Sequence, residues 1–257
     1  MNEPNAPGGD LSPSPATSSL LARMFNVLVA PGEVFDEVRS APGSTANWLV
    51  PALILMVVGA ISLWLACSQP AVQQQMSEFL EKTLEKQGNA AQMNEQARAM
   101  AEKIGLISMK VSQVLQPVAA AAITPFWGGL IIWLVGAKIT KGNFGYLKAV
   151  EVAGLTNVIG ILEVVVRALF IVALGNMFAG PHLGLTLKEF DTSNPLHYSL
   201  AAANPLMFWG LAVQALGMAK LSGMSFAKSL AWLLAIYVLL SGCMIGCSVA
   251  MQGLGRR

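Results

Sequence analysis

The chain has 257 residues, of which 54% are hydrophobic and only 12% are charged, and its formal net charge is +2. Soluble domains contain roughly 25% charged residues, so this chain has about half the usual share. Together with a mean hydropathy of +0.58, this composition excludes an ordinary soluble domain. The small net charge also gives no support for a nucleic-acid partner.

The N-terminal part divides into a polar tail and an amphipathic segment. Residues 1–19 are polar and rich in Pro, Ser and Gly, which predicts a disordered tail. Over residues 20–45 we expect an interfacial amphipathic segment, because apolar residues recur there at helical spacing around Arg23. A second short helix is predicted to begin at Pro31, and its Phe35 and Val38 should face either lipid or the bundle.

Five long apolar runs follow, at about 48–66, 118–137, 149–174, 200–219 and 230–251. A helix needs about 20 such residues to cross a hydrocarbon core of roughly 30 Å. All of these runs except the third lack charged residues. The predicted fold class is therefore all-α: a polytopic membrane bundle with five transmembrane helices over residues 46–251, followed by a short tail at 252–257.

The loops predict an insertion and an orientation. Residues 68–116 are polar with helical periodicity, which predicts a helical extramembrane insertion; a solvated loop and a hairpin docked on the membrane are both open. In the short connections, Lys138, Lys141, Lys148, Lys220 and Lys228 lie on one side, and a single lysine lies on the other. The positive-inside rule then places the N-terminus in the cytoplasm and the C-terminus outside.

The third run contains the candidate intramembrane polar site. Glu163 and Arg167 are four residues apart, the favoured order for an ion pair, and Thr156 shares their side of the helix with Asn157 at its edge. One interpretation is a structural pair that locks the bundle, which we favour because the other runs contain no acidic or basic residue. The other is a proton-sensitive or substrate-contacting site. Glu151, near the start of this run, is expected to reach headgroups or water.

Small residues predict close helix packing at two places. Gly128 and Gly129 in the second run would allow another helix to approach closely. Gly242 and Gly246 in the last run are one turn apart, which predicts a tight contact either within the bundle or between protomers.

Residues with catalytic or metal-binding potential are few. The sequence lacks a phosphate-binding glycine loop, an HExxH motif and a CxxC pair. His182 and His197 flank Asp191 in one loop, but their spacing matches no short metal motif, and stable sites usually need three or four ligands. We therefore predict no enzyme activity, no catalytic residue, no metal site and no cofactor.

Three blocks of sequence follow one another in a fixed order. The first block, VAPGEVFDEVRSAPGSTANWLVPALI, contains Pro31, Phe35, Pro42, Trp48 and Pro51. The second, KGNFGYLKAVEVAGLTNVIGIL, enters the third run. The third block, from Asn204 to Leu234, has a Phe-Trp helix start, a glycine-bearing run and a short Ser/Lys turn. Together these blocks resemble the Yip-one (YIP) domain family of five-span membrane proteins, in its prokaryotic-type form.

The resemblance implies a membrane protein without established catalysis. Eukaryotic relatives act in vesicle traffic and contact prenylated GTPases, but this chain lacks their acidic-aromatic DLYGP-type motif. We expect a non-enzymatic scaffold or accessory protein for membrane organisation or partner binding in a bacterial inner membrane. Its partners would be the lipid bilayer and a second copy or another membrane protein. The alternative is a transporter or channel component that uses Glu163 and Arg167.

Overall fold

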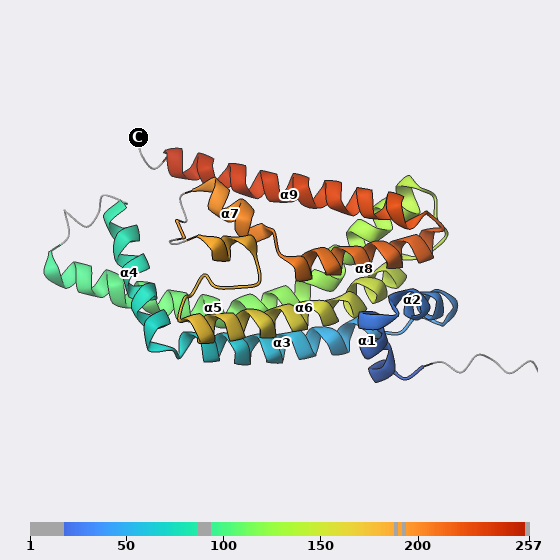
Figure 1. The fold of residues 1–257 in the computed structure, drawn as a ribbon, viewed down its shortest axis with the longest axis horizontal. Helices are drawn as coiled ribbons and strands as arrows, with labels where there is room; N and C mark the ends of the chain where they lie inside the picture. The colour runs from blue at the N-terminus through green and yellow to red at the C-terminus, as the bar shows by residue number, and fades with distance from the viewer. Residues whose placement is uncertain (1–17, 87–93, 188–189, 192–193, 255–257) are drawn as a thin grey trace, which may run out of the picture.

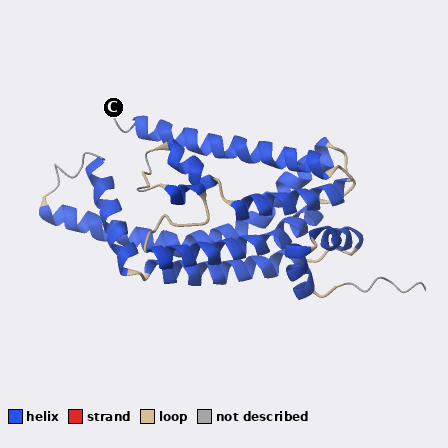
Figure 2. Cartoon of the chain, viewed as in Figure 1, coloured by secondary structure: helices blue, strands red, loops and turns tan. Residues whose placement is uncertain are grey.

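The computed structural model describes residues 18–86, 94–187, 190–191 and 194–254, and every regular element in these ranges is a helix (Figure 2). The helices are α1 (Leu20–Val29), α2 (Pro31–Ser40), α3 (Ala46–Cys67), α4 (Pro70–Lys86), α5 (Glu95–Trp133), the π-helix η1 (Leu134–Ile139), α6 (Tyr146–Leu174), the 3-10 helix η2 (Leu183–Thr186), α7 (Pro195–Ala202), α8 (Pro205–Ser222) and α9 (Phe226–Leu254). The polar tail predicted over residues 1–19 lies almost wholly outside the described ranges, as do residues 255–257 of the short tail.

Among the described residues, four helices are long and apolar enough to cross a membrane: α3, α5 with η1, α6 and α9. The pair α7 and α8, bent by 57°, supplies a fifth span if it is counted as one. The structure thus confirms the all-α polytopic membrane bundle. The predicted run 200–219 is not one straight helix, because Pro205 begins α8 and the side chain of Asn204 caps it by accepting the Leu206 N–H.

The insertion and the second span share one helix. The sequence suggested an extramembrane helix that ends near residue 116 and a span that starts at 118, but α5 is continuous from Glu95 to Trp133 and includes Pro117. A Cβ on Gly59 of α3 would lie only 2.7 Å from the Pro117 Cβ, so the glycine leaves room for the proline ring. A proline inside a membrane helix is tolerated where a neighbouring helix covers the site in this way.

Helix α6 lies at the centre of the bundle, and α1, α2, α3, α5 and α8 all pack against it (Figure 1). One end of the molecule, which we call the α1–α2 end, contains α1, α2, η1 with residues 140–145, and the turn from α8 to α9 (Figure 1). The opposite end, the α4 end, contains α4 and the connection between α6 and α7.

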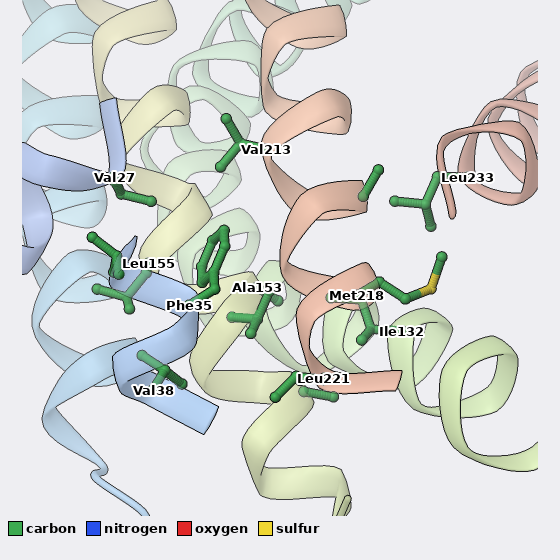
Figure 3. Packing of buried hydrophobic residues seen from close by; sticks show 14 of the residues in the cluster. Val27, Phe35, Val38, Ile132, Ala153, Leu155, Val213, Met218, Leu221 and Leu233 are labelled. Carbon is green, nitrogen blue, oxygen red and sulfur yellow. The ribbon is translucent and has the colours of Figure 1, made fainter. Parts of the chain in front are cut away.

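Both short N-terminal helices contribute to the main hydrophobic core. Val27 of α1 and Phe35 and Val38 of α2 are completely buried, and Figure 3 shows them beside Leu155 of α6 and near α8. Of the two orientations open for Phe35 and Val38, the structure shows the one toward the bundle. The opposite side of α1 exposes Leu21, Phe25 and Val29, which recur every four residues.

The predicted packing glycines fall into two groups. A Cβ on Gly128 would lie 2.5 Å from the Gln214 Nε2, and one on Gly129 would lie 2.9 Å from the Val150 Cα, so α5 approaches its neighbours closely at both residues. By contrast, a Cβ on Gly242 or Gly246 would meet no atom within 4 Å. Among the described residues no neighbouring helix approaches this pair closely, and a contact between protomers stays a prediction.

Candidate functional site

A connected set of polar side chains crosses the bundle at the α1–α2 end; we call it the polar chain. It consists of Glu37, Arg23, Asn47, Glu151 and Lys148. The Arg23 Nη2 lies 2.8 Å from the Glu37 Oε1, and its Nη1 donates to the Asn47 Oδ1 at 3.2 Å. The Asn47 Nδ2 then donates to the Glu151 Oε2 at 2.6 Å, and the Glu151 Oε1 lies 3.1 Å from the Lys148 Nζ.

The polar chain joins the three consecutive helices α1, α2 and α3 to α6, whose Glu151 lies 104 residues after Asn47. Arg23 lies on the inner side of α1 beside Met24 and Val27, and Asn47 lies in the first turn of α3. The Lys148 Nζ also donates to two backbone carbonyls in and after α2, those of Val38 at 2.8 Å and Pro42 at 3.2 Å. Helices α1 and α2 are thereby fastened to α3 and α6.

Glu151 differs most from its expected position. The sequence placed it at headgroups or water, yet it is only 2% exposed. The reason is tertiary: α2 and the turn after it cover the first turns of α6, and Lys148 and Asn47 replace the water that the carboxylate loses. A buried carboxylate is tolerated when it is paired and hydrogen-bonded in this way.

The outer end of the polar chain is held by the carboxylate of Glu37. Its partial burial opposes ionisation, but hydrogen bonds from Arg23 and Ser18 outweigh that effect and lower the pKa of Glu37 below its usual value. Glu37 is therefore ionised at neutral pH and neutralises the buried guanidinium beside it.

The predicted intramembrane site is arranged differently from the expected ion pair. The Glu163 Oε1 accepts a hydrogen bond of 2.6 Å from the Asn204 Nδ2, just before α8. Among the described residues, no ion pair joins Glu163 to Arg167, whose side chain is exposed. The physical reason is that the side-chain amide of Asn204 reaches the half-buried carboxylate of Glu163, whereas Arg167 extends toward the connection near Gly180.

The two other residues of the predicted site make separate contacts. The Thr156 hydroxyl donates to the Val152 carbonyl of its own helix at 2.9 Å. The Asn157 Nδ2 donates to the Thr124 Oγ1 at 3.1 Å and so links α6 to α5. The four residues therefore do not converge on one point. The hydrogen bond of Asn157 ties α6 to α5, and that of Glu163 ties α6 to Asn204 at the start of α8.

Sequence reasoning assigned none of Glu37, Arg23, Asn47, Lys148 and Asn204 to a polar site. Both asparagines carry a recognisable signal: Asn47 stands just before the run at 48–66, and Asn204 lies near the start of the run at 200–219, directly before Pro205. Asparagine there can cap a helix and still offer its amide group to a neighbouring helix. Arg23 had a weaker signal, as a lone base among apolar residues.

The α4 end is an ordered cap. The Gln75 side chain of α4 donates to the Gly175 carbonyl at 2.6 Å and accepts from the Met177 N–H at 3.0 Å. Phe178 stacks on Phe190 with ring centroids 4.8 Å apart, and Phe79 of α4 packs against Phe178. These contacts hold α4 against the connection that follows α6, and docking of the insertion on the membrane stays a prediction.

His182, in the connection after α6, and His197, in α7, take part in the same cap. Burial lowers the pKa of His182, and the nearby Arg167 lowers it further. The His197 Nδ1 accepts from the Asp191 N–H at 2.9 Å, and its ring lies 5.9 Å from that of Phe190. In the described part of the chain, no three His, Cys, Asp or Glu side chains are grouped so that they could hold a metal ion.

The family comparison covers nearly the whole of this architecture. The model of the Yip1 domain matches residues 25–248, a range that begins in α1 and ends in α9. Comparison with curated proteins and with solved structures gives no match. The match includes every candidate span and all of the polar chain except Arg23. The chain therefore belongs to the Yip1 domain family of membrane proteins.

Proposed function

We propose that this protein is a non-enzymatic membrane scaffold whose α1–α2 end faces the cytoplasm and binds a protein partner. The observation that carries this proposal is the polar chain. Its two acids and two bases pair with one another and with Asn47, and these contacts hold α1 and α2 to α3 and α6. These contacts make the surface at the α1–α2 end rigid and leave the charged groups of the polar chain paired, which favours partner binding over catalysis.

The distribution of charge supports this orientation. Arg39, Lys138, Lys141, Lys220 and Lys228 all lie at the α1–α2 end, in or beside its short connections. Basic residues close to the ends of spans are retained on the cytoplasmic side. A surface at this end would accordingly be available to partners in the cytoplasm.

Helix α2 offers the surface best suited to a partner. Its inner side is buried through Val34, Phe35 and Val38, while Glu33 and Arg39 are exposed. The neighbouring apolar stripe of α1, Leu21, Phe25 and Val29, is suited to the membrane interface, where it would set the height of α2 above the lipid. A charged helix held at a fixed height is the geometry that a membrane scaffold needs.

The transporter alternative would need hydrated polar groups at the middle of the bundle. Glu163, one of the two residues predicted for this role, bonds to Asn204 just before α8, and Asn157 of the same predicted site bonds to Thr124 of α5. These contacts favour a structural role for them. Ion or solute flux through purified protein in liposomes would support the alternative, and a flux abolished by Glu163→Gln would establish it.

Site-specific photo-crosslinking in native membranes tests the proposal. A crosslinker at Glu33 on α2 should capture one defined protein or a second copy of the chain. A matched crosslinker at Glu102, an exposed acid on α5 at the α4 end, should not capture the same product. Identical products from both positions, or none from Glu33, would contradict a binding surface on α2.

A further inference from the structure

A hollow of about 450 Å³ lies between η1 and the first turns of α9, at the α1–α2 end. Thr140, Met224, Lys228, Ala231, Trp232 and Ala235 line it. In Figure 1 this region is where the yellow-green helix end meets the start of the red helix α9. The volume falls within the roughly 300–1,000 Å³ range of small-ligand pockets.

One face of α9 forms most of this groove. Lys228, Ala231, Trp232 and Ala235 are spaced by three or four residues, so they lie on one side of the helix. The small side chains of Ala231 and Ala235 leave the space of the groove unfilled, and Trp232, which is 40% exposed, forms one wall. The groove is thus apolar along its length and cationic at the end nearer the start of α9.

The ammonium group of Lys228 gives the groove its chemical preference. In the described ranges its Nζ has no ion pair and no hydrogen bond, whereas Lys220 at the same end is paired with Asp36. A second base, Lys138, lies in η1 two residues before the groove residue Thr140, with its Nζ 4.7 Å from the Trp133 ring centroid. An anionic group at the mouth would therefore meet a positive potential.

We infer that this groove binds one anionic phospholipid from the leaflet that meets the α1–α2 end. One of its two acyl chains lies along Ala231, Trp232 and Ala235, and its phosphate meets Lys228. The bilayer supplies lipid at this depth, and basic pockets between membrane helices are known to recognise anionic headgroups. Tryptophan one turn below a lysine also matches the level at which indole rings prefer to lie.

The test is native mass spectrometry of the full chain titrated with phosphatidylglycerol or with phosphatidylcholine of the same acyl chains. Phosphatidylglycerol should bind more tightly. Lys228→Gln should weaken it by about fivefold, the effect expected for one lysine at an anionic surface. Ala235→Leu, which fills the groove, should lower the affinity for both lipids. Lys220→Gln, the matched control that removes a paired charge outside the groove, should leave both affinities unchanged.

Three outcomes would overturn the inference. Equal affinity for the two lipids would show that the net negative charge of the headgroup plays no part in binding. Equal effects of Lys228→Gln and Lys220→Gln would show that net charge, not this groove, determines binding. Displacement of phosphatidylglycerol by soluble glycerol phosphate would show that the site takes a free phosphate and not a lipid. If Lys228→Gln does not fold, Ala235→Leu alone decides, because unchanged lipid binding in that variant contradicts the groove.

Discussion

Replacing Asn47 by leucine perturbs the polar chain at its central member. The change removes the donor to the Glu151 Oε2 at 2.6 Å and the acceptor for the Arg23 Nη1 at 3.2 Å. Arg23 is 8% exposed and Glu151 is 2% exposed, so water cannot easily replace the lost amide. Two buried charged groups would each lose a hydrogen bond.

The expected loss of stability follows from these two groups. Leaving a buried polar group unsatisfied costs about 1–3 kcal/mol, and the cost is higher for a charged group. We therefore expect Asn47→Leu to lower the free energy of unfolding by about 2–6 kcal/mol. Asn157→Leu is the matched control, because the bond from Asn157 to Thr124 is exposed and its loss should cost about 1 kcal/mol.

The assay is unfolding in mixed detergent micelles, followed by tryptophan fluorescence. A double-mutant cycle of Asn47→Leu and Glu151→Leu isolates their coupling, which should be about 0.5–3 kcal/mol for residues in contact. The reasoning is refuted if Asn47→Leu costs no more than Asn157→Leu, or if the effects of the two changes in the cycle are simply additive.

Three further changes have defined outcomes. Asn204→Leu removes both the cap of α8 and the bond to the carboxylate on α6, and should cost about 2–4 kcal/mol in the same unfolding assay. Gly154→Val should abolish the yield of folded protein in detergent, because a Cβ there would lie 2.3 Å from the Trp48 Cα, whereas Gly160→Ala should fold normally because its Cβ meets nothing within 4 Å. The lowered pKa of Glu37 means that its stabilising contribution is present above its usual value of 4.5 and is lost as pH falls through the folded-state value. Glu37→Gln should accordingly flatten the acid limb of stability against pH, and an unchanged acid limb would contradict the assignment.

The membrane architecture follows from the sequence because hydropathy acts locally. A run such as 48–66 has little alternative to a membrane helix, and α3 covers it fully. The break before Pro205 is also a local signal, since asparagine followed by proline both ends one helix and starts the next. The predicted span at 200–219 ignores this signal, because the surrounding apolar residues alone suggest a continuous helix.

The polar contacts could not be predicted in the same way, because they depend on which helices meet. The i,i+4 spacing of Glu163 and Arg167 indicated a pair, but the amide of Asn204, 41 residues away, reaches the carboxylate. Likewise Asn47 and Glu151 are 104 residues apart. Only the parallel packing of α3 against α6 brings them together.

The orientation of the α1–α2 end is the claim on which the proposed function depends. The most direct measurement is cysteine labelling in intact cells, in a parent lacking Cys67, Cys243 and Cys247, with one cysteine at Lys141 or at the exposed Thr186. A membrane-impermeant maleimide should label Thr186→Cys directly and Lys141→Cys only after permeabilisation. Direct labelling of Lys141→Cys, with Thr186→Cys protected or equally labelled, would contradict a cytoplasmic α1–α2 end.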